Sequence, residues 1–172
     1  MHVSSFAYLV SSFIHIALQI NSDGHCLFSA IADQLSLLGV ITQSTYITVR
    51  AAAADYIQSH PDDFIPFIPS ASEDVMSQSE LARYCASIRD TAEWGGELEI
   101  LALSRAYNIP IHIVQGGTPS IVKHSPEGVD ANTSNRNVVF ISYHRKMYGL
   151  GEVGKAPCHS SVITDKIGRA HV

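Results

Sequence analysis

The sequence predicts an α+β fold in which helices pack on a small β-sheet. Two observations lead to this prediction. Apolar residues recur at helical spacing between Cys26 and Asn108, and two short apolar runs typical of strands follow them. The chain has 172 residues, of which 46% are hydrophobic and 16% charged, so one domain with a sizeable core is expected.

Four helices are predicted ahead of those two runs. Leu27, Ile31 and Leu35 show the i, i+4 spacing of a buried helical face. The predicted helices cover about residues 26–38, 44–60, 77–88 and 98–108. Gly39 and Pro61 are typical helix stops, and Ser44 and Ser77 (or Ser79) are typical caps. Residues 62–72 contain two prolines and are predicted to form a loop.

The predicted strands are short. Residues 137–143 (NVVFISY) form the clearest one, residues 109–114 are expected to be a buried strand, and a polar loop is predicted over residues 116–136. A further strand is expected at residues 17–20, just ahead of the first helix.

The most informative residue is Cys26, where a loop ends and a helix begins. Backbone N–H groups at a helix N-terminus stabilise a thiolate, and a thiolate is a nucleophile. Gly24 allows a tight turn, the N–H groups of Gly24 and His25 are candidate oxyanion-hole donors, and Asp23 is placed to cap the helix or to orient the loop. The alternative is a buried structural cysteine.

Composition excludes several classes of protein. A net charge of −5 without a basic stripe argues against a nucleic-acid partner. Three cysteines without a CxxC pair make a poor disulfide framework and a poor zinc site, so neither a metal nor a cofactor is expected. Residues 1–22 carry no formal charge, but polar residues interrupt them and no flanking Lys or Arg sets an orientation, so a membrane span is not expected.

Four segments, in order, resemble the ovarian-tumour (OTU) family of deubiquitinating cysteine proteases. The segments are SDGHCLFSAIADQL, RAAAADYIQSHPDDFIPF, EWGGELEILALSRAYNIPIHIVQ and VVFISYHRKMYGLGE. The first contains the D-G-x-C motif of the family and the third its W-G-G-x-x-E motif. The resemblance covers roughly residues 20–152.

This resemblance implies a thiol isopeptidase that removes ubiquitin from protein conjugates. Cys26 would attack the carbonyl carbon at the ubiquitin C-terminus, and a histidine would act as general base and then as general acid. Asp23 matches the motif aspartate. The Trp94–Glu97 segment matches a mainly structural motif, with Trp94 expected to anchor the core. Ubiquitin and ubiquitinated proteins are the expected partners, and a cytoplasmic, also nuclear, monomer is expected.

The general base is less obvious than the nucleophile. In the family pattern, G-L-G-E is followed by His-Tyr-Asn or His-Tyr-Asp and then Ser-Val. Here six other residues follow Glu152, and His159 then precedes Ser-Ser-Val. We therefore predict a catalytic set of Cys26, His159 and Asp23, with His144 as the second choice of base. The alternative is a ubiquitin-binding module whose catalysis is impaired because its base is misplaced.

These segments divide the chain into three parts. Residues 1–16 are a lead-in that matches nothing in the family, residues 17–152 form the OTU-like catalytic domain, and residues 153–172 are an atypical tail. A retained intron followed by sequencing-adapter read-through would account for this tail, in which case it is not native coding sequence.

The remaining candidate side chains have simpler interpretations. His112 is predicted to be a satisfied core histidine and Cys85 a core residue on an apolar helix face. Cys158 beside His159 offers two metal ligands without further partners, which is a weak metal site.

Overall fold

The computed structural model describes residues 17–20, 23–68, 76–115, 118–128, 137–145 and 158–163. Its helices are α2 (Cys26–Leu37), α3 (Tyr46–Ser59), α4 (Pro61–Phe64), α5 (Gln78–Asp90) and α6 (Glu97–Ala106), with a short 3-10 helix η1 (Ile65–Phe67). The strands are β1 (Ala17–Gln19), β2 (Ile111–Gln115), β3 (Ile121–His124), β4 (Val139–Arg145) and β5 (Cys158–Ile163). Helices and strands share one fold, so the predicted α+β class is confirmed.

Local signals account for the ends of the helices. The side chain of Ser77 accepts a hydrogen bond from the Glu80 N–H, while the Glu80 carboxylate accepts one from the Ser77 N–H, which forms a capping box at the start of α5. Gly39 and Asn108 adopt positive φ values of 68° and 51° after α2 and α6. Each is followed by a backbone bond that closes the helix, as in a Schellman motif.

Two local predictions were wrong. Thr45, not Ser44, caps α3, because Thr45 and Thr48 exchange side-chain and backbone hydrogen bonds. Residues 61–67 form α4 and η1 rather than a loop, since proline fits the first turn of a helix and Phe64 is buried. Residues 69–72 of that predicted loop lie outside the described residues.

The described strands form one five-stranded sheet in the order β1-β5-β4-β2-β3. β2 and β4 are parallel, and the other neighbouring pairs are antiparallel. β3 lies within the predicted polar loop and β5 within the atypical tail, and neither was predicted. Their own sequences show little period-2 alternation, so each is defined by its pairing with a neighbouring strand.

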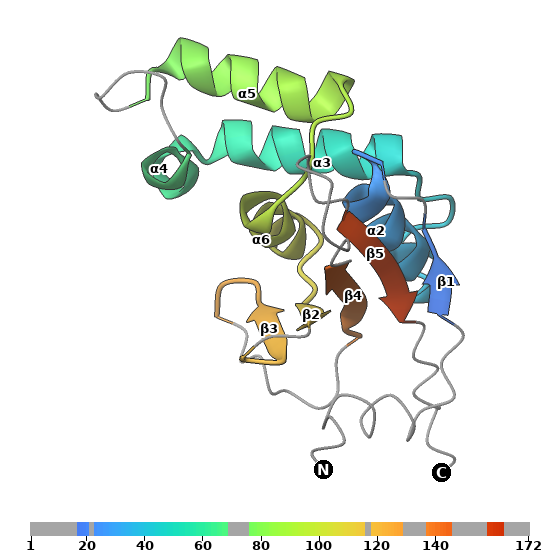
Figure 1. Cartoon of the computed structure of the whole chain (residues 1–172). Helices are drawn as coiled ribbons and strands as arrows, with labels where there is room; N and C mark the ends of the chain where they lie inside the picture. The colour runs from blue at the N-terminus through green and yellow to red at the C-terminus, as the bar shows by residue number, and fades with distance from the viewer. Residues whose placement is uncertain are drawn as a thin grey trace, which may run out of the picture.

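The helices lie on one side of this sheet in successive layers (Figure 1). α2 and α6 are next to the sheet, α3 packs on both of them, and α5 packs on α3. The core between these layers includes Phe28, Ile31, Val49, Leu103 and Ile141, all of which are buried. This packing brings the first residues of α2 close to the loop between α5 and α6.

No helix within the described ranges is long and apolar enough to span a membrane. Residues 1–16 and 21–22 of the segment 1–22, for which no membrane span was expected, lie outside those ranges.

Candidate active site

Cys26 is the first residue of α2 and is only 2% exposed. The predicted placement of this cysteine at a helix N-terminus is therefore confirmed. The Cys26 N–H donates to the Asp23 carbonyl at 3.1 Å. His25 is the N-cap residue, and its carbonyl accepts the first helical hydrogen bond, from the Ser29 N–H at 2.9 Å. The thiol thus lies at the positive end of the helix dipole, which favours a thiolate.

Asp23 orients this loop rather than capping the helix. Its carboxylate accepts a hydrogen bond from the His25 N–H at 2.8 Å, and α2 has no side-chain cap. The N–H groups of His25 and Cys26 both donate to Asp23. An oxyanion at Cys26 would therefore have to compete with Asp23 for either donor. We call residues 23–26 the nucleophile loop.

The segment between α5 and α6, residues 91–96, packs directly on the nucleophile loop. A Cβ atom at Gly24 would lie 1.7 Å from the Ala92 carbonyl oxygen. A Cβ atom at Gly95 would lie 2.7 Å from side-chain atoms of both Leu27 and Phe28. We call residues 91–96 the WGG loop. Gly24 is thus needed for close contact with the chain's own backbone, and its φ is not in the positive region.

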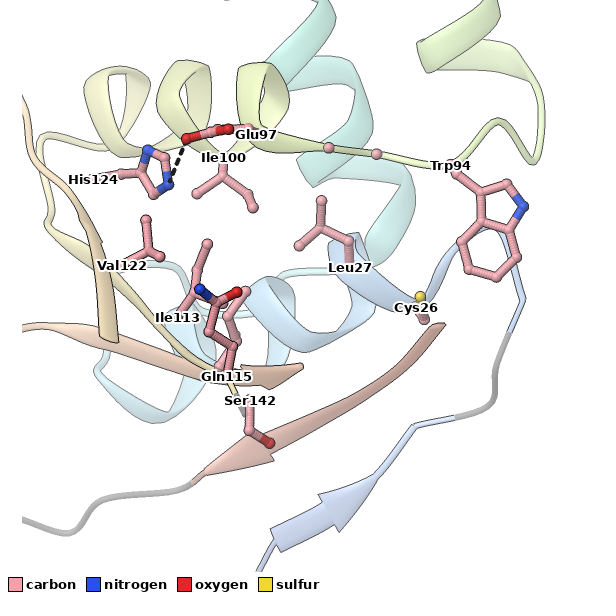
Figure 2. A pocket seen from close by; sticks show the side chains of 13 residues that line it. Cys26, Leu27, Trp94, Glu97, Ile100, Ile113, Gln115, Val122, His124 and Ser142 are labelled. Atoms are coloured by element: carbon pink, nitrogen blue, oxygen red, sulfur yellow. Dashed lines mark ion pairs between the residues drawn. The ribbon is translucent and has the colours of Figure 1, made fainter. Parts of the chain in front are cut away.

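A cavity of about 420 Å³ lies between the nucleophile loop, the WGG loop and the sheet. Cys26 and Trp94 lie at one end of it, and His124 and Glu97 lie toward the other (Figure 2). The sheet contributes further lining residues, namely Ile113, Gln115, Val122, Ile141 and Ser142. The nucleophile candidate therefore faces a space large enough for part of a peptide chain.

The prediction for Trp94 was wrong. Its side chain is 40% exposed and lines the cavity instead of anchoring the core. The reason lies in the next residue, because the backbone of Gly95 itself fills the space against Leu27 and Phe28. The indole lies at the same end of the cavity as Cys26 (Figure 2).

Glu99 is a site-supporting residue that sequence reasoning overlooked. It is 2% exposed, and its carboxylate accepts hydrogen bonds from the Gly96 N–H at 2.6 Å and from the Tyr84 hydroxyl. Burial and the neighbouring Glu99 raise the pKa of Tyr84, which keeps this hydroxyl a donor. Glu99 thereby ties the WGG loop to α5. Its place in the W-G-G-x-x-E motif was the available signal.

Two histidines of the sheet are buried without a hydrogen bond to Nε2 from any described residue: His112 and His124. The His112 ring packs edge-on against Phe140 with centroids 5.2 Å apart, so its predicted core position is confirmed, but the prediction that it is satisfied was wrong. Nε2 of His124 lies 4.0 Å from the Glu97 carboxylate. Burial lowers the pKa of both imidazoles, and Glu97 partly opposes this for His124.

These shifts predict a loss of stability in mild acid. The folded-state pKa of each histidine lies below its ordinary value of 6.5, so the unfolded chain binds more protons as the pH falls below that value. The stabilisation is complete above about pH 6.5 and is lost as the pH falls through the folded-state pKa values. We expect urea unfolding to show a lower free energy of unfolding at about pH 5.5 than at about pH 7.5.

In the variant His112→Gln this pH dependence should become weaker, because one proton-linked group is removed. His60→Gln is the matched control, since His60 is exposed at the end of α3. An unchanged pH dependence of stability in His112→Gln would contradict the conclusion that burial lowers the pKa of His112.

The two candidate bases lie on adjacent strands. In the register of β4 and β5, His144 is the partner of His159, while Ile141 is the partner of Val162. Their side chains lie outside the described part of the structure, so no contact with Cys26 is assigned to either. β4 and β5 are inner strands of the sheet, but both histidines lie beyond the residues of these strands that pair with β2 and β1.

Cys85 is buried on α5, as predicted for a core residue, and burial raises the pKa of its thiol. Cys85 and Cys26 are both buried but have different surroundings. Cys85 is enclosed by helix packing, whereas Cys26 lines the cavity. Within the described residues, no group of three or more His, Cys, Asp or Glu side chains is arranged to hold a metal ion.

The fold and the site together define a class of protein. A cysteine at a helix N-terminus, beside a peptide-sized cavity on an α+β scaffold, is the arrangement of a thiol-dependent hydrolase. The family model for OTU-like cysteine proteases matches residues 21–152. The chain therefore belongs to the OTU family of cysteine proteases, as its motifs had indicated.

Individual relatives agree with this assignment. The chain is 42% identical over 135 residues to the deubiquitinase OTUD6B of Gallus gallus, a match that covers 78% of the chain and 42% of the relative. Among solved structures it is similar to the OTU domain of OTUD1, with a TM-score of 0.62, 19% identity and coverage of 92% and 91% of the two chains. It is also similar to a ubiquitin-bound OTU deubiquitinase from Wolbachia pipientis, with a TM-score of 0.57, 17% identity and coverage of 88% and 96%. The matched region is thus less than half the length of the curated relative.

Proposed function

We propose that this chain is a cysteine-dependent isopeptidase that removes ubiquitin from protein conjugates. The observation that carries the proposal is the position of Cys26, at the N-terminus of α2 and at one end of the cavity. Membership of the OTU family supports it, as does the deubiquitinase name of the relative from Gallus gallus. The ubiquitin-bound Wolbachia structure supports ubiquitin as the partner.

In the proposed reaction, the Cys26 thiolate attacks the carbonyl carbon of the isopeptide bond. The carbonyl oxygen takes up the negative charge, and the N–H groups of His25 and Cys26 stabilise it in exchange for their hydrogen bonds to Asp23. The C–N bond then breaks, and the leaving lysine amine takes a proton from the general base, which had received it from the thiol. Water hydrolyses the resulting thioester and regenerates Cys26. We assign the base to His159 and the loop-orienting role to Asp23.

The register of β5 favours a second candidate function, a ubiquitin-binding module with impaired catalysis. The family pattern places its histidine four positions before the valine, so the two positions share one face of a strand. His159 is three positions before Val162, so this position belongs to the other face of the strand. Cys158 occupies the position that corresponds to the family histidine.

The test uses ubiquitin that carries a C-terminal electrophile. For an active isopeptidase, we expect one ubiquitin to become attached, with the adduct located on Cys26 by peptide mass spectrometry. Protein that retains unmodified ubiquitin without forming the adduct would support the binding module. Protein that neither reacts with ubiquitin nor retains it would contradict both functions.

Three variants then assign the base. If His159 is the base, His159→Ala should slow labelling by about 10²-fold or more, and the register partner His144→Ala should react at the normal rate. If catalysis is impaired because His159 belongs to the wrong face of β5, Cys158→His should instead raise the labelling rate. His159→Ala should then leave the labelling rate unchanged. Slow labelling of His144→Ala alone would transfer the role to His144.

A further inference from the structure

Arg50 on α3 is the largest fully buried side chain among the residues whose burial the structure describes, with an exposure of 1%. A buried guanidinium needs partners for all of its N–H groups, because an unpaired buried charge is costly. Arg50 has partners on three separate segments of the chain. None of them is an acidic side chain within hydrogen-bond distance, so the residue is not held by a simple ion pair.

The partners of Arg50 are mostly backbone carbonyls. Nη1 donates to the Ile88 carbonyl on α5 at 2.6 Å. Nη2 donates to the carbonyls of both Gly24 and Glu93, the latter at 2.6 Å. Nε donates to Nδ1 of His25 at 3.1 Å. One guanidinium thus joins the nucleophile loop, the WGG loop and the C-terminal turn of α5.

These bonds determine the conformation of the backbone just before Cys26. A fixed Gly24 carbonyl fixes the peptide plane between Gly24 and His25. Since Nδ1 of His25 accepts a hydrogen bond, the ring proton is on Nε2, and the ring is further held against Tyr46 with centroids 4.5 Å apart. Both the main chain and the side chain that precede the nucleophile are therefore held by contacts from α3.

The same guanidinium also holds the WGG loop at the end of the cavity where Cys26 lies. Glu93 immediately precedes Trp94, which lines the cavity beside Cys26. The Arg50 guanidinium carbon lies 4.2 Å from the centre of the Phe28 ring, and that ring packs against Gly95. Arg50 therefore lies beneath the contact between the two loops and binds both.

We propose that Arg50 is a positioning residue for the Cys26 nucleophile, which holds the nucleophile loop and the WGG loop together as one preorganised unit. The catalytic part of this inference rests on the proposed isopeptidase function. Its structural part does not, because it concerns the opening of the two loops. Lysine retains the positive charge but lacks the planar fork that reaches several carbonyls at once, so Arg50→Lys separates geometry from charge.

The experiment measures alkylation of the two buried cysteines by iodoacetamide in the whole chain. The rates at Cys26 and Cys85 are followed separately by peptide mass spectrometry. In Arg50→Lys we expect Cys26 to react about 10- to 100-fold faster, because the loops open more often, and Cys85 to change much less. Arg105→Lys is the matched control, since the partners of Arg105 are Asp63 and Glu127, which belong to neither loop. This control should leave the ratio of the two rates unchanged.

The readouts distinguish positioning from general stability. An equal acceleration at Cys26 and Cys85, or no acceleration at Cys26, would overturn the proposal. If Arg50→Lys does not fold, the ratio of the alkylation rates at Cys26 and Cys85 is measured in Arg50→Gln at low temperature instead. With the ubiquitin electrophile, Arg50→Lys should lower the maximal labelling rate by about 10-fold or more with little change in the half-saturating concentration. If the unsubstituted protein never reacts with the ubiquitin electrophile, the isopeptidase function is refuted. The ratio of the alkylation rates at Cys26 and Cys85 would still decide the role of Arg50.

Discussion

Replacing Cys26 by serine is expected to lower the cleavage of a ubiquitin conjugate by about 10⁴-fold or more. A serine hydroxyl is deprotonated far less readily than a thiol. The N-terminus of α2 stabilises a thiolate at this position. The replacement is nearly isosteric at a site that is only 2% exposed, so packing of the loop should be preserved. Release of free ubiquitin from a di-ubiquitin substrate measures the effect.

Cys85→Ser is the matched control for this experiment. Cys85 is equally buried but belongs to the core on α5, away from the cavity lining. It should retain the normal rate at temperatures where the variant is folded. Cys26→Ser should still bind ubiquitin, as measured by fluorescence polarisation with labelled ubiquitin. Normal cleavage by Cys26→Ser would remove Cys26 from the mechanism.

The largest effect on stability is expected for Gly24→Ala. The added Cβ atom would lie 1.7 Å from the Ala92 carbonyl oxygen, so the backbone of one loop must move. That movement would also separate the Gly24 carbonyl from Arg50. We expect a loss of about 3 kcal/mol or more in the free energy of unfolding, measured by urea denaturation.

Gly96→Ala is the control for a glycine in the same region. A Cβ atom there would meet only the Glu99 carboxylate at 3.6 Å, which is an ordinary contact, and the φ of Gly96 is −129°. Its cost should stay below about 1 kcal/mol. Equal stability of the two variants would show that the nucleophile loop and the WGG loop are not in direct contact.

The helices were predictable from the sequence because their signals are local. The i, i+4 pattern of Leu27, Ile31 and Leu35, the capping box that begins at Ser77 and the positive φ of Gly39 each involve residues within one or two helical turns. The same is true of Cys26, since a loop motif followed by an apolar helix is read within a few residues. Four ordered segments that resemble OTU motifs then indicated the family.

The cavity and its support depended on contacts between distant residues. Arg50 reaches the carbonyls of Gly24, Ile88 and Glu93 across separations of 26, 38 and 43 residues. β3 and β5 likewise owe their existence to pairing partners, because their own patterns are weak. Trp94 was assigned to the core by its residue type, yet the glycine beside it made the contact instead.

By itself, the sequence determined the α+β class, the approximate extents of α2, α3, α5 and α6, and the position of the nucleophile at a helix N-terminus, because propensity, capping and periodicity act over a few residues. Only the tertiary structure decided which walls enclose Cys26, which carbonyls bind Arg50 and which residue on β5 pairs with His144. Those features arise from packing and hydrogen bonding between segments, which no local pattern encodes.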